Sequence, residues 1–247
     1  MNTKDLVFDI YIINLDKDVD RLEKITTELR PNLFKRIKAI NGNEHDFINE
    51  PSIYQTSKYF CPKSVLGCNL SHRLALKTFL DESKKDMALI LEDDAEPIHK
   101  NYIERIEKCI CSAPDDWDII KLDWMRNLPF SDSKKEFLCG YSAFATAYLI
   151  NKKGANKILN NTIYWHYDID INFYGLNIYN NNEKLFKQNW NNNGSNNQTM
   201  PFLITNIETI DILNYKILRV EDNEFSGGGL LCFIFFAYFF LMNCCND

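Results

Sequence analysis

Three consecutive acidic residues follow a short apolar run in the middle of the chain. The stretch MALILEDDAEP places Glu92, Asp93 and Asp94 directly after residues 87–91. Neighbouring carboxylates repel one another unless a cation or hydrogen bonds hold them. Since side chains alternate along a strand, we expect Glu92 and Asp94 to point to one face and Asp93 to the other. Such a pair suits a hard divalent cation, Mn²⁺ or Mg²⁺, that would hold a diphosphate; the alternative is a solvated strand end.

The composition limits the classes of function. The 247 residues are 45% hydrophobic and 13% aromatic, enough for a buried core. The net charge of −6 argues against a nucleic-acid partner. The eight cysteines form no paired CxxC motif, so zinc is not predicted. Neither GxxxxGK[ST] nor GxGxxG occurs, which disfavours kinases and dinucleotide oxidoreductases but not nucleotide-sugar enzymes.

Strands and helices are predicted to alternate. Hydrophobic periodicity indicates strands over residues 7–14, 34–40, 87–91, 117–122 and 141–150 (the last a strand or strand pair), and helices over 18–30, 64–83, 101–111 and 151–159. This order predicts an α/β fold with a central, mostly parallel sheet flanked by helices. Ligands of such sheets bind at the carboxyl ends of the strands. Ten of the twenty-one residues 177–197 are asparagine, which predicts a polar loop.

The two ends of the chain lead to predictions about domains and location. One domain is expected over residues 1–226, followed by a glycine hinge and an apolar tail over 227–247. The thirteen apolar residues 230–242 are fewer than the roughly 20 of a membrane-spanning helix. We therefore weigh a buried or partner-docked tail against peripheral membrane contact through Leu230–Met242. The first residues show no signal peptide, which favours a cytoplasmic protein, membrane-associated if the tail meets lipid.

Seven segments, in order, resemble glycosyltransferase family 25, the group of lipooligosaccharide and collagen galactosyltransferases. They lie within residues 7–195 and read IYIINLDKDVDRLEKI, KAINGNE, LGCNLSHRLALK, ALILEDDAEP, DDWDIIKL, TAYLINKKGANKIL and LNIYNNNEKLFKQ. The resemblance implies a GT-A-like nucleotide-sugar-binding fold and an inverting transferase. It also implies a UDP-sugar donor, usually UDP-galactose, a glycan acceptor of lipooligosaccharide or glycoprotein type, and Mn²⁺ or Mg²⁺ as the cofactor.

The resemblance also implies roles for individual residues. The expected metal ligands are Asp94, Glu92 and His166. The expected donor-binding residues are Ile13, Asn14, Arg21, Ser71, His72, Glu92, Asp93 and Gln188. The catalytic base is expected to be Asp168 or Asp170, and the sequence does not choose between them. Asp123 follows the strand WDIIKL, near the rim of the expected pocket; we weigh a role there against an ordinary strand-end acid and favour the latter.

A non-catalytic descendant that binds a glycan or a partner is the alternative hypothesis. The asparagine-rich segment replaces a region that in the family includes proline and serine near Gln188. The residues after Asn197 resemble no part of the family. Such a protein would bind a UDP-sugar without transferring the sugar.

Overall fold

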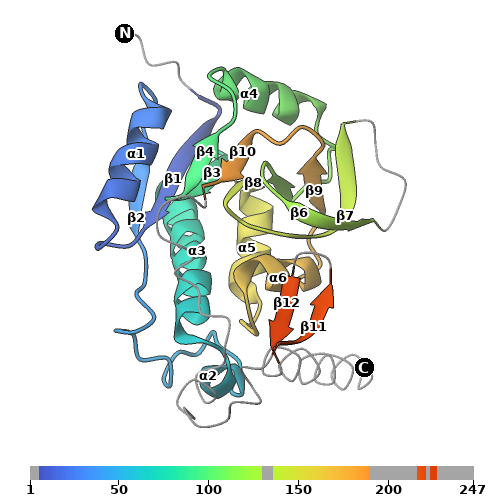
Figure 1. Cartoon of the computed structure of the whole chain (residues 1–247). Helices are drawn as coiled ribbons and strands as arrows, with labels where there is room; N and C mark the ends of the chain where they lie inside the picture. The colour runs from blue at the N-terminus through green and yellow to red at the C-terminus, as the bar shows by residue number, and fades with distance from the viewer. Residues whose placement is uncertain (1–5, 130–135, 190–215, 221–222, 227–247) are drawn as a thin grey trace.

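The computed structural model describes residues 6–129, 136–189, 216–220 and 223–226. Its centre is an eight-stranded sheet of order β2-β1-β3-β8-β5-β9-β7-β6 (Figure 1). The strands are β1 (Phe8–Asn14), β2 (Lys35–Lys38), β3 (Met87–Glu92), β5 (Ile119–Lys121), β6 (Met125–Pro129), β7 (Phe137–Ala143), β8 (Ala147–Asn151) and β9 (Ile178–Asn181). Two small antiparallel sheets pair β4 (Ala95–Pro97) with β10 (Phe186–Gln188) and β11 (Lys216–Val220) with β12 (Asn223–Ser226).

The central sheet is mixed, with most strands running in one direction. Strand β1 is parallel to both β2 and β3, and β5 is parallel to β9. Strand β8 is antiparallel to β3 and β5, β7 to β9, and β6 to β7. Only β7 and β8 therefore run against the other strands of this sheet. The expected α/β class with a mostly parallel sheet is confirmed.

Helices cover both faces of the sheet. Helices α1 (Val19–Leu29) and α4 (Tyr102–Ser112) pack on one face. Helices α3 (Lys63–Glu82), α5 (Lys152–Asn160) and α6 (Tyr167–Asp170), with the 3₁₀ turn Ile171–Phe173, pack on the other, where α3 and α5 lie side by side (Figure 1). A one-turn helix, α2 (Ser57–Phe60), precedes α3.

Strand β1 shows why the strands have apolar residues on both faces. Ile10 and Ile12 join the core under α1 and α4, whereas Tyr11 and Ile13 join the core under α3 and α5. A strand covered on both faces needs apolar side chains at consecutive positions, as the run VFDIYIIN provides.

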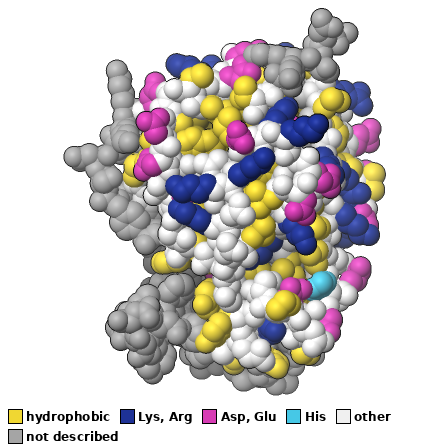
Figure 2. Space-filling model, turned by 180° about the vertical axis from the view of Figure 1, so that it is seen from behind, with side chains coloured by type: hydrophobic (Ala, Val, Ile, Leu, Met, Phe, Trp, Pro, Cys, Tyr) yellow, Lys and Arg dark blue, Asp and Glu magenta, His cyan; other side chains and the backbone are white. Residues whose placement is uncertain are grey.

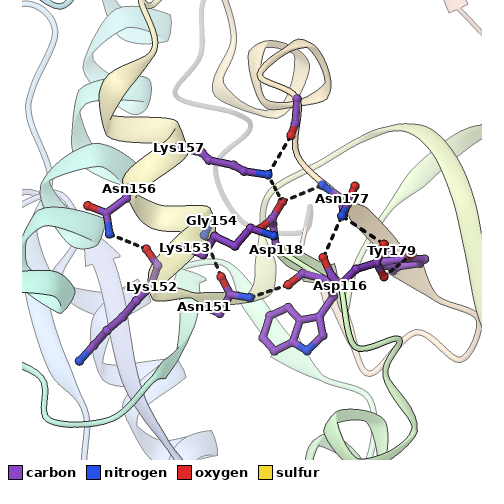
Figure 3. Close-up of polar contacts among 12 residues, drawn as sticks. Asp116, Asp118, Asn151, Lys152, Lys153, Gly154, Asn156, Lys157, Asn177 and Tyr179 are labelled. Atoms are coloured by element: carbon purple, nitrogen blue, oxygen red, sulfur yellow. Dashed lines mark hydrogen bonds and ion pairs between the residues drawn. The ribbon is translucent and has the colours of Figure 1, made fainter.

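A buried carboxylate at the amino end of β5 holds helix α5 in place (Figure 3). The Asp118 side chain is fully buried and accepts hydrogen bonds from Lys157 Nζ at 2.6 Å and from the Asn177 amide at 2.9 Å. Lys153 Nζ lies 3.3 Å from its other oxygen. A Cβ on Gly154 would lie 2.6 Å from the Asp118 carbonyl oxygen, so only glycine lets α5 approach this closely. These contacts join α5 and the start of β9 to β5.

The prediction of a polar loop over residues 177–197 is wrong for its first part. Strand β9 lies inside the sheet between β5 and β7, and β10 pairs with β4. The buried Asn180 side chain accepts a 2.8 Å hydrogen bond from Ser142 Oγ, so this asparagine is satisfied within the sheet. Composition could not reveal such a partner. Residues 190–197 lie outside the described part of the chain.

The predictions for the tail are not tested. Residues 227–247 lie outside the described residues, so the domain division and the membrane contact stay predictions. Within the described ranges, no helix is both long and apolar enough to cross a bilayer. On the face shown in Figure 2, basic and acidic side chains are interspersed with apolar ones.

Candidate active site

A cleft of about 140 Å³ opens at the carboxyl ends of the parallel strands β1, β2 and β3. This is the position at which open α/β sheets bind ligands. Its walls also include residues of α1, α3 and β10. The lining residues are Ile13, Asn14, Leu15, Lys17, Arg21, Ala39, Ile40, Asn41, Gly42, Asn43, Ser64, Cys68, Ser71, His72, Glu92, Asp93, Asp94 and Gln188. The structure thus brings together all eight residues predicted to bind the donor, with Asp94.

The three acids do not alternate as expected. Strand β3 ends at Glu92, and the following two residues form a turn. Glu92 contacts His72 on α3, whereas Asp93 and Asp94 both contact Arg21 on α1. The prediction that Glu92 and Asp94 share one face and Asp93 takes the other is therefore wrong. The chain turns after Glu92, so the alternation of a strand does not apply to Asp93 and Asp94. All three still line the cleft.

Arg21 holds the two aspartates of the turn. Its guanidinium lies 3.2 Å from Asp93 Oδ1 and 2.8 Å from Asp94 Oδ2. Asn14 Nδ2 donates to Asp93 Oδ2 at 2.8 Å, and Gln188 Nε2 donates to Asp94 Oδ2 at 3.0 Å. The Arg21 side chain is 22% exposed and paired with both aspartates, so it is not a solvent-facing helix residue.

Asp94 has an unusual environment for a carboxylate. Burial, with the nearby charge of Glu92, raises its pKa to about 7, and burial raises the pKa of Asp93 to about 6. Asp94 Oδ1 is buried and has no hydrogen-bond partner among the described residues. A buried carboxylate oxygen without a donor is costly, and a bound cation would satisfy it. The Asp94 carboxylate therefore fits a hard divalent cation.

His72 is held in a fixed orientation in the wall of the cleft. Its Nε2 lies 3.0 Å from Glu92 Oε1 and its Nδ1 lies 3.1 Å from the Tyr148 hydroxyl. The ring stacks on Tyr167, with centroids 4.1 Å apart and planes 4° from parallel. The Tyr148 and Tyr167 hydroxyls are 2.9 Å apart. The side chain of His72 is 1% exposed, and the Glu92 side chain that it contacts is 26% exposed.

Ser71 and Gly42 shape the turn that follows β2. Ser71 Oγ accepts from the Ile40 amide at 2.8 Å and donates to the Gly67 carbonyl at 2.6 Å. A Cβ on Gly42 would lie 2.0 Å from the Lys63 carbonyl oxygen, so the turn packs directly on the start of α3. Ser71 therefore positions the cleft wall with its hydroxyl already hydrogen-bonded inside the protein.

Asp168, Asp170 and His166 are not among the residues that line this cleft. The buried Asp170 accepts hydrogen bonds from the amides of Tyr164 and Trp165 and from Asn69 Nδ2, at 2.9 to 3.1 Å. Asp168 Oδ2 accepts a 2.8 Å bond from the Phe144 amide. Phe144 has φ = 72°, a left-handed conformation that favours glycine.

His166 precedes α6 as its N-cap residue, and its ring meets Trp165 edge-on at 5.5 Å between centroids. Burial lowers its pKa. The His166 ring therefore packs against its neighbour in the chain, and its metal role stays a prediction.

Three residues gain importance that the sequence did not give them. Asp123 is buried, and its Oδ2 has no hydrogen-bond partner within the described ranges. Burial raises the pKa of Asp123 to about 6, although hydrogen bonds from the backbone of Trp124 and Gln188 act in the opposite direction and lower it. Gln188 thus contacts both Asp94 and Asp123. Cys68 and Lys17 line the cleft. Cys68 lies four residues before His72 on a helix, and Lys17 lies four residues before Arg21 at the start of one. This spacing was the sequence signal that could have identified Cys68 and Lys17.

The fold and the cleft define a mixed α/β protein with an acidic ligand site at the strand ends. Residues 8–173 match the family model of glycosyltransferase family 25 (LPS biosynthesis protein). The chain belongs to glycosyltransferase family 25, as its motifs indicated.

The individual proteins that resemble this chain share 27% or less of its sequence. Procollagen galactosyltransferase 1-B of Xenopus laevis is 27% identical over 172 residues, which are 62% of this chain and 28% of that protein. The chain thus spans less than a third of the length of this relative. The protein A197 from STIV has a TM-score of 0.41 at 11% identity, covering 77% of this chain and 98% of its own. A Drosophila β-1,4-galactosyltransferase 7 mutant in complex with manganese, UDP-Gal and xylobiose has a TM-score of 0.36 at 11% identity, covering 76% and 77%. Both TM-scores are low, so these two likenesses say nothing about the activity of this chain.

Proposed function

We propose that this glycosyltransferase moves a sugar, most simply galactose, from a UDP-sugar to a hydroxyl group of a glycan acceptor, with inversion at the anomeric carbon. The observation that carries the proposal is the buried, unpartnered Oδ1 of Asp94 beside Arg21 in a cleft at the strand ends. Galactose is supported by the name of the Xenopus relative, which resembles only part of this chain.

The walls of the cleft suit a nucleoside diphosphate. Ile13 and Asn14 end β1 and line the cleft, and we assign the base to this part of the wall. Lys17 and Arg21 supply positive charge on the same side. Arginine binds phosphate oxygens in a planar, two-pronged geometry. When phosphate enters, Arg21 can keep Asp93 while one nitrogen turns from Asp94 towards the ligand.

Asp94 is the residue we assign to the cation. Mn²⁺ or Mg²⁺ bound there would neutralise the charge that develops on the leaving UDP. His72 presents its Nε2 edge towards Glu92 in the wall of the cleft. Gln188 keeps Asp94 oriented through its 3.0 Å hydrogen bond.

We keep Asp168 as a candidate proton acceptor and propose Asp123 as a second candidate in place of Asp170. Asp170 is already surrounded by four donors, including the Tyr174 hydroxyl, and is proposed to be structural. Asp123 has a raised pKa and an unpartnered oxygen, both of which favour a general base. Asp168→Asn and Asp123→Asn should separate the two: loss of the base lowers kcat by about 10²- to 10⁴-fold and leaves UDP binding within about threefold.

The deciding experiment is calorimetric titration with UDP-galactose in Mn²⁺ and then in EDTA, followed by a screen of glycan acceptors. Binding that requires the metal, together with sugar transfer, supports the full proposal. Metal-dependent binding without any product would support the alternative, a non-catalytic descendant. Absence of binding from a folded sample would refute the donor site. A cytoplasmic location and membrane contact through Leu230–Met242 stay predictions, to be checked by cell fractionation with and without that segment.

A further inference from the structure

Three side chains with metal-binding atoms converge on the α3 side of the cleft. The ligand atoms of Cys68, His72 and Glu92 all lie within 4.8 Å of one another. Cys68 and His72 are separated by four residues on α3, so both occupy one helix face, and Glu92 meets them from the end of β3. Asp94 is not part of this group and is paired with Arg21 instead.

We propose that Cys68, His72 and Glu92 form a second cation site, distinct from the Asp94 site and selective for Zn²⁺ over Mn²⁺ or Mg²⁺. One sulfur, one imidazole and one carboxylate form a ligand set suited to zinc, whereas Mn²⁺ and Mg²⁺ prefer oxygen ligands. Three protein ligands leave the fourth tetrahedral position open. All three residues line the cleft, so that position is available to water or to a bound ligand.

The surroundings of His72 support a metal ligand. A ligating imidazole uses one nitrogen for the metal and donates its other N–H to a neighbouring oxygen. Here the Tyr148 hydroxyl lies 3.1 Å from Nδ1 and can accept a hydrogen bond from the Nδ1–H group. The Tyr148 hydroxyl can in turn donate its own hydrogen bond to the Tyr167 hydroxyl, 2.9 Å away. Nε2 is then free to present its lone pair towards Cys68 and Glu92. The stacked Tyr167 ring fixes the imidazole in this orientation.

The spacing between the His72 nitrogen and the Glu92 oxygen requires only a small adjustment, and the three ligand atoms start within 4.8 Å of one another. Nε2 and Glu92 Oε1 are 3.0 Å apart. Tetrahedral zinc with bonds of about 2.0 Å to nitrogen and oxygen separates two ligands by about 3.3 Å. Glu92 is 26% exposed at the side chain, so it can move by this amount. On binding, the Cys68 thiol gives its proton to solvent and coordinates as the thiolate.

The test measures metal binding by the full-length, metal-free protein with neither donor nor acceptor present. Zn²⁺ is titrated against a chromophoric chelator, and Co²⁺ is used as a spectroscopic substitute for zinc. We expect one high-affinity site, a cobalt–thiolate absorption band, and at least tenfold weaker Zn²⁺ binding in both Cys68→Ser and Glu92→Gln. Circular dichroism checks that each variant is folded; if Cys68→Ser is not, Glu92→Gln and the cobalt spectrum of the unmodified protein decide.

Control variants exclude other thiols. Cys111→Ser removes an exposed cysteine of α4, and a Cys244→Ser/Cys245→Ser double variant removes the pair near the end of the chain. Both should bind Zn²⁺ like the unmodified protein. Asp94→Asn should change Zn²⁺ affinity by less than about threefold. Unchanged Zn²⁺ affinity in folded Cys68→Ser, loss of binding in either thiol control, or equal loss in Asp94→Asn would each overturn the proposal. Failure of UDP-galactose to bind would refute the proposed function and leave this site untouched.

Discussion

The Asp94→Asn variant should be more stable than the unmodified protein when metal is absent. Burial and the charge of Glu92 raise the pKa of Asp94 from 3.8 to about 7. A carboxyl group whose pKa is raised in the folded state makes its most favourable contribution to the free energy of unfolding at pH values below its unfolded-state pKa. This contribution is lost as the pH rises from about 4 through about 7. Ionised Asp94 therefore destabilises the metal-free protein at pH 8.

The size of the effect follows from the shift. About three pKa units correspond to about 4 kcal/mol above pH 7, at about 1.4 kcal/mol per unit. At pH 5 the ionisation of Asp94 has reduced the free energy of unfolding by only about 1.6 kcal/mol, which corresponds to slightly more than one pKa unit. Relaxation and water entry around the ionised group reduce both values. An amide is uncharged, like the protonated acid, and its NH₂ group can occupy the place of the unpartnered Oδ1. We expect a gain of about 2 kcal/mol at pH 8 and under about 1 kcal/mol at pH 5.

The assay is urea denaturation in EDTA at pH 5, 6, 7 and 8. Asp86→Asn is the matched control, because it makes the same chemical change at a side chain that is 91% exposed. Its stability should differ little from that of the unmodified protein at every pH. In a second arm, Mn²⁺ at about 100 times its dissociation constant should stabilise the unmodified protein by about 2.7 kcal/mol and leave Asp94→Asn unchanged. A variant that is less stable at pH 8, or that is stabilised equally by Mn²⁺, would refute the reasoning.

Three further substitutions test how the site is supported, each measured by denaturation. Asp170→Asn should cost about 2 kcal/mol or more, because the new NH₂ group would face backbone N–H donors; a gain like that of Asp94→Asn would contradict this. Gly42→Ala should cost about 1–3 kcal/mol and weaken UDP binding, since its Cβ would lie 2.0 Å from the Lys63 carbonyl oxygen. Asp118→Asn should cost about 2–4 kcal/mol, because the 2.6 Å ion pair with Lys157 is lost, while UDP affinity of the folded protein stays the same.

The sequence by itself determined the class of fold and the location of the site. Continuous apolar runs predict strands that are buried on both faces, and amphipathic runs with period 3.6 predict helices, so β1, β3, α1, α3 and α4 were predicted with small errors at their ends. The carboxyl ends of parallel strands must meet at one edge of a sheet. Asn14 and Glu92 lie at the ends of two predicted strands, so both were expected at that edge, and the structure pairs these strands directly.

Tertiary structure alone decided the environment of each side chain. Local spacing did not reveal how the turn after β3 directs its side chains, and Asp94 there contacts Arg21, seventy-three residues away. It also did not reveal the donors around Asp170, which lie on segments up to 101 residues distant. Hydrogen bonds, burial and pKa depend on such distant partners. The pattern of residue types gave the candidates, and only their packing assigned which carboxylates are satisfied and which are open to a ligand.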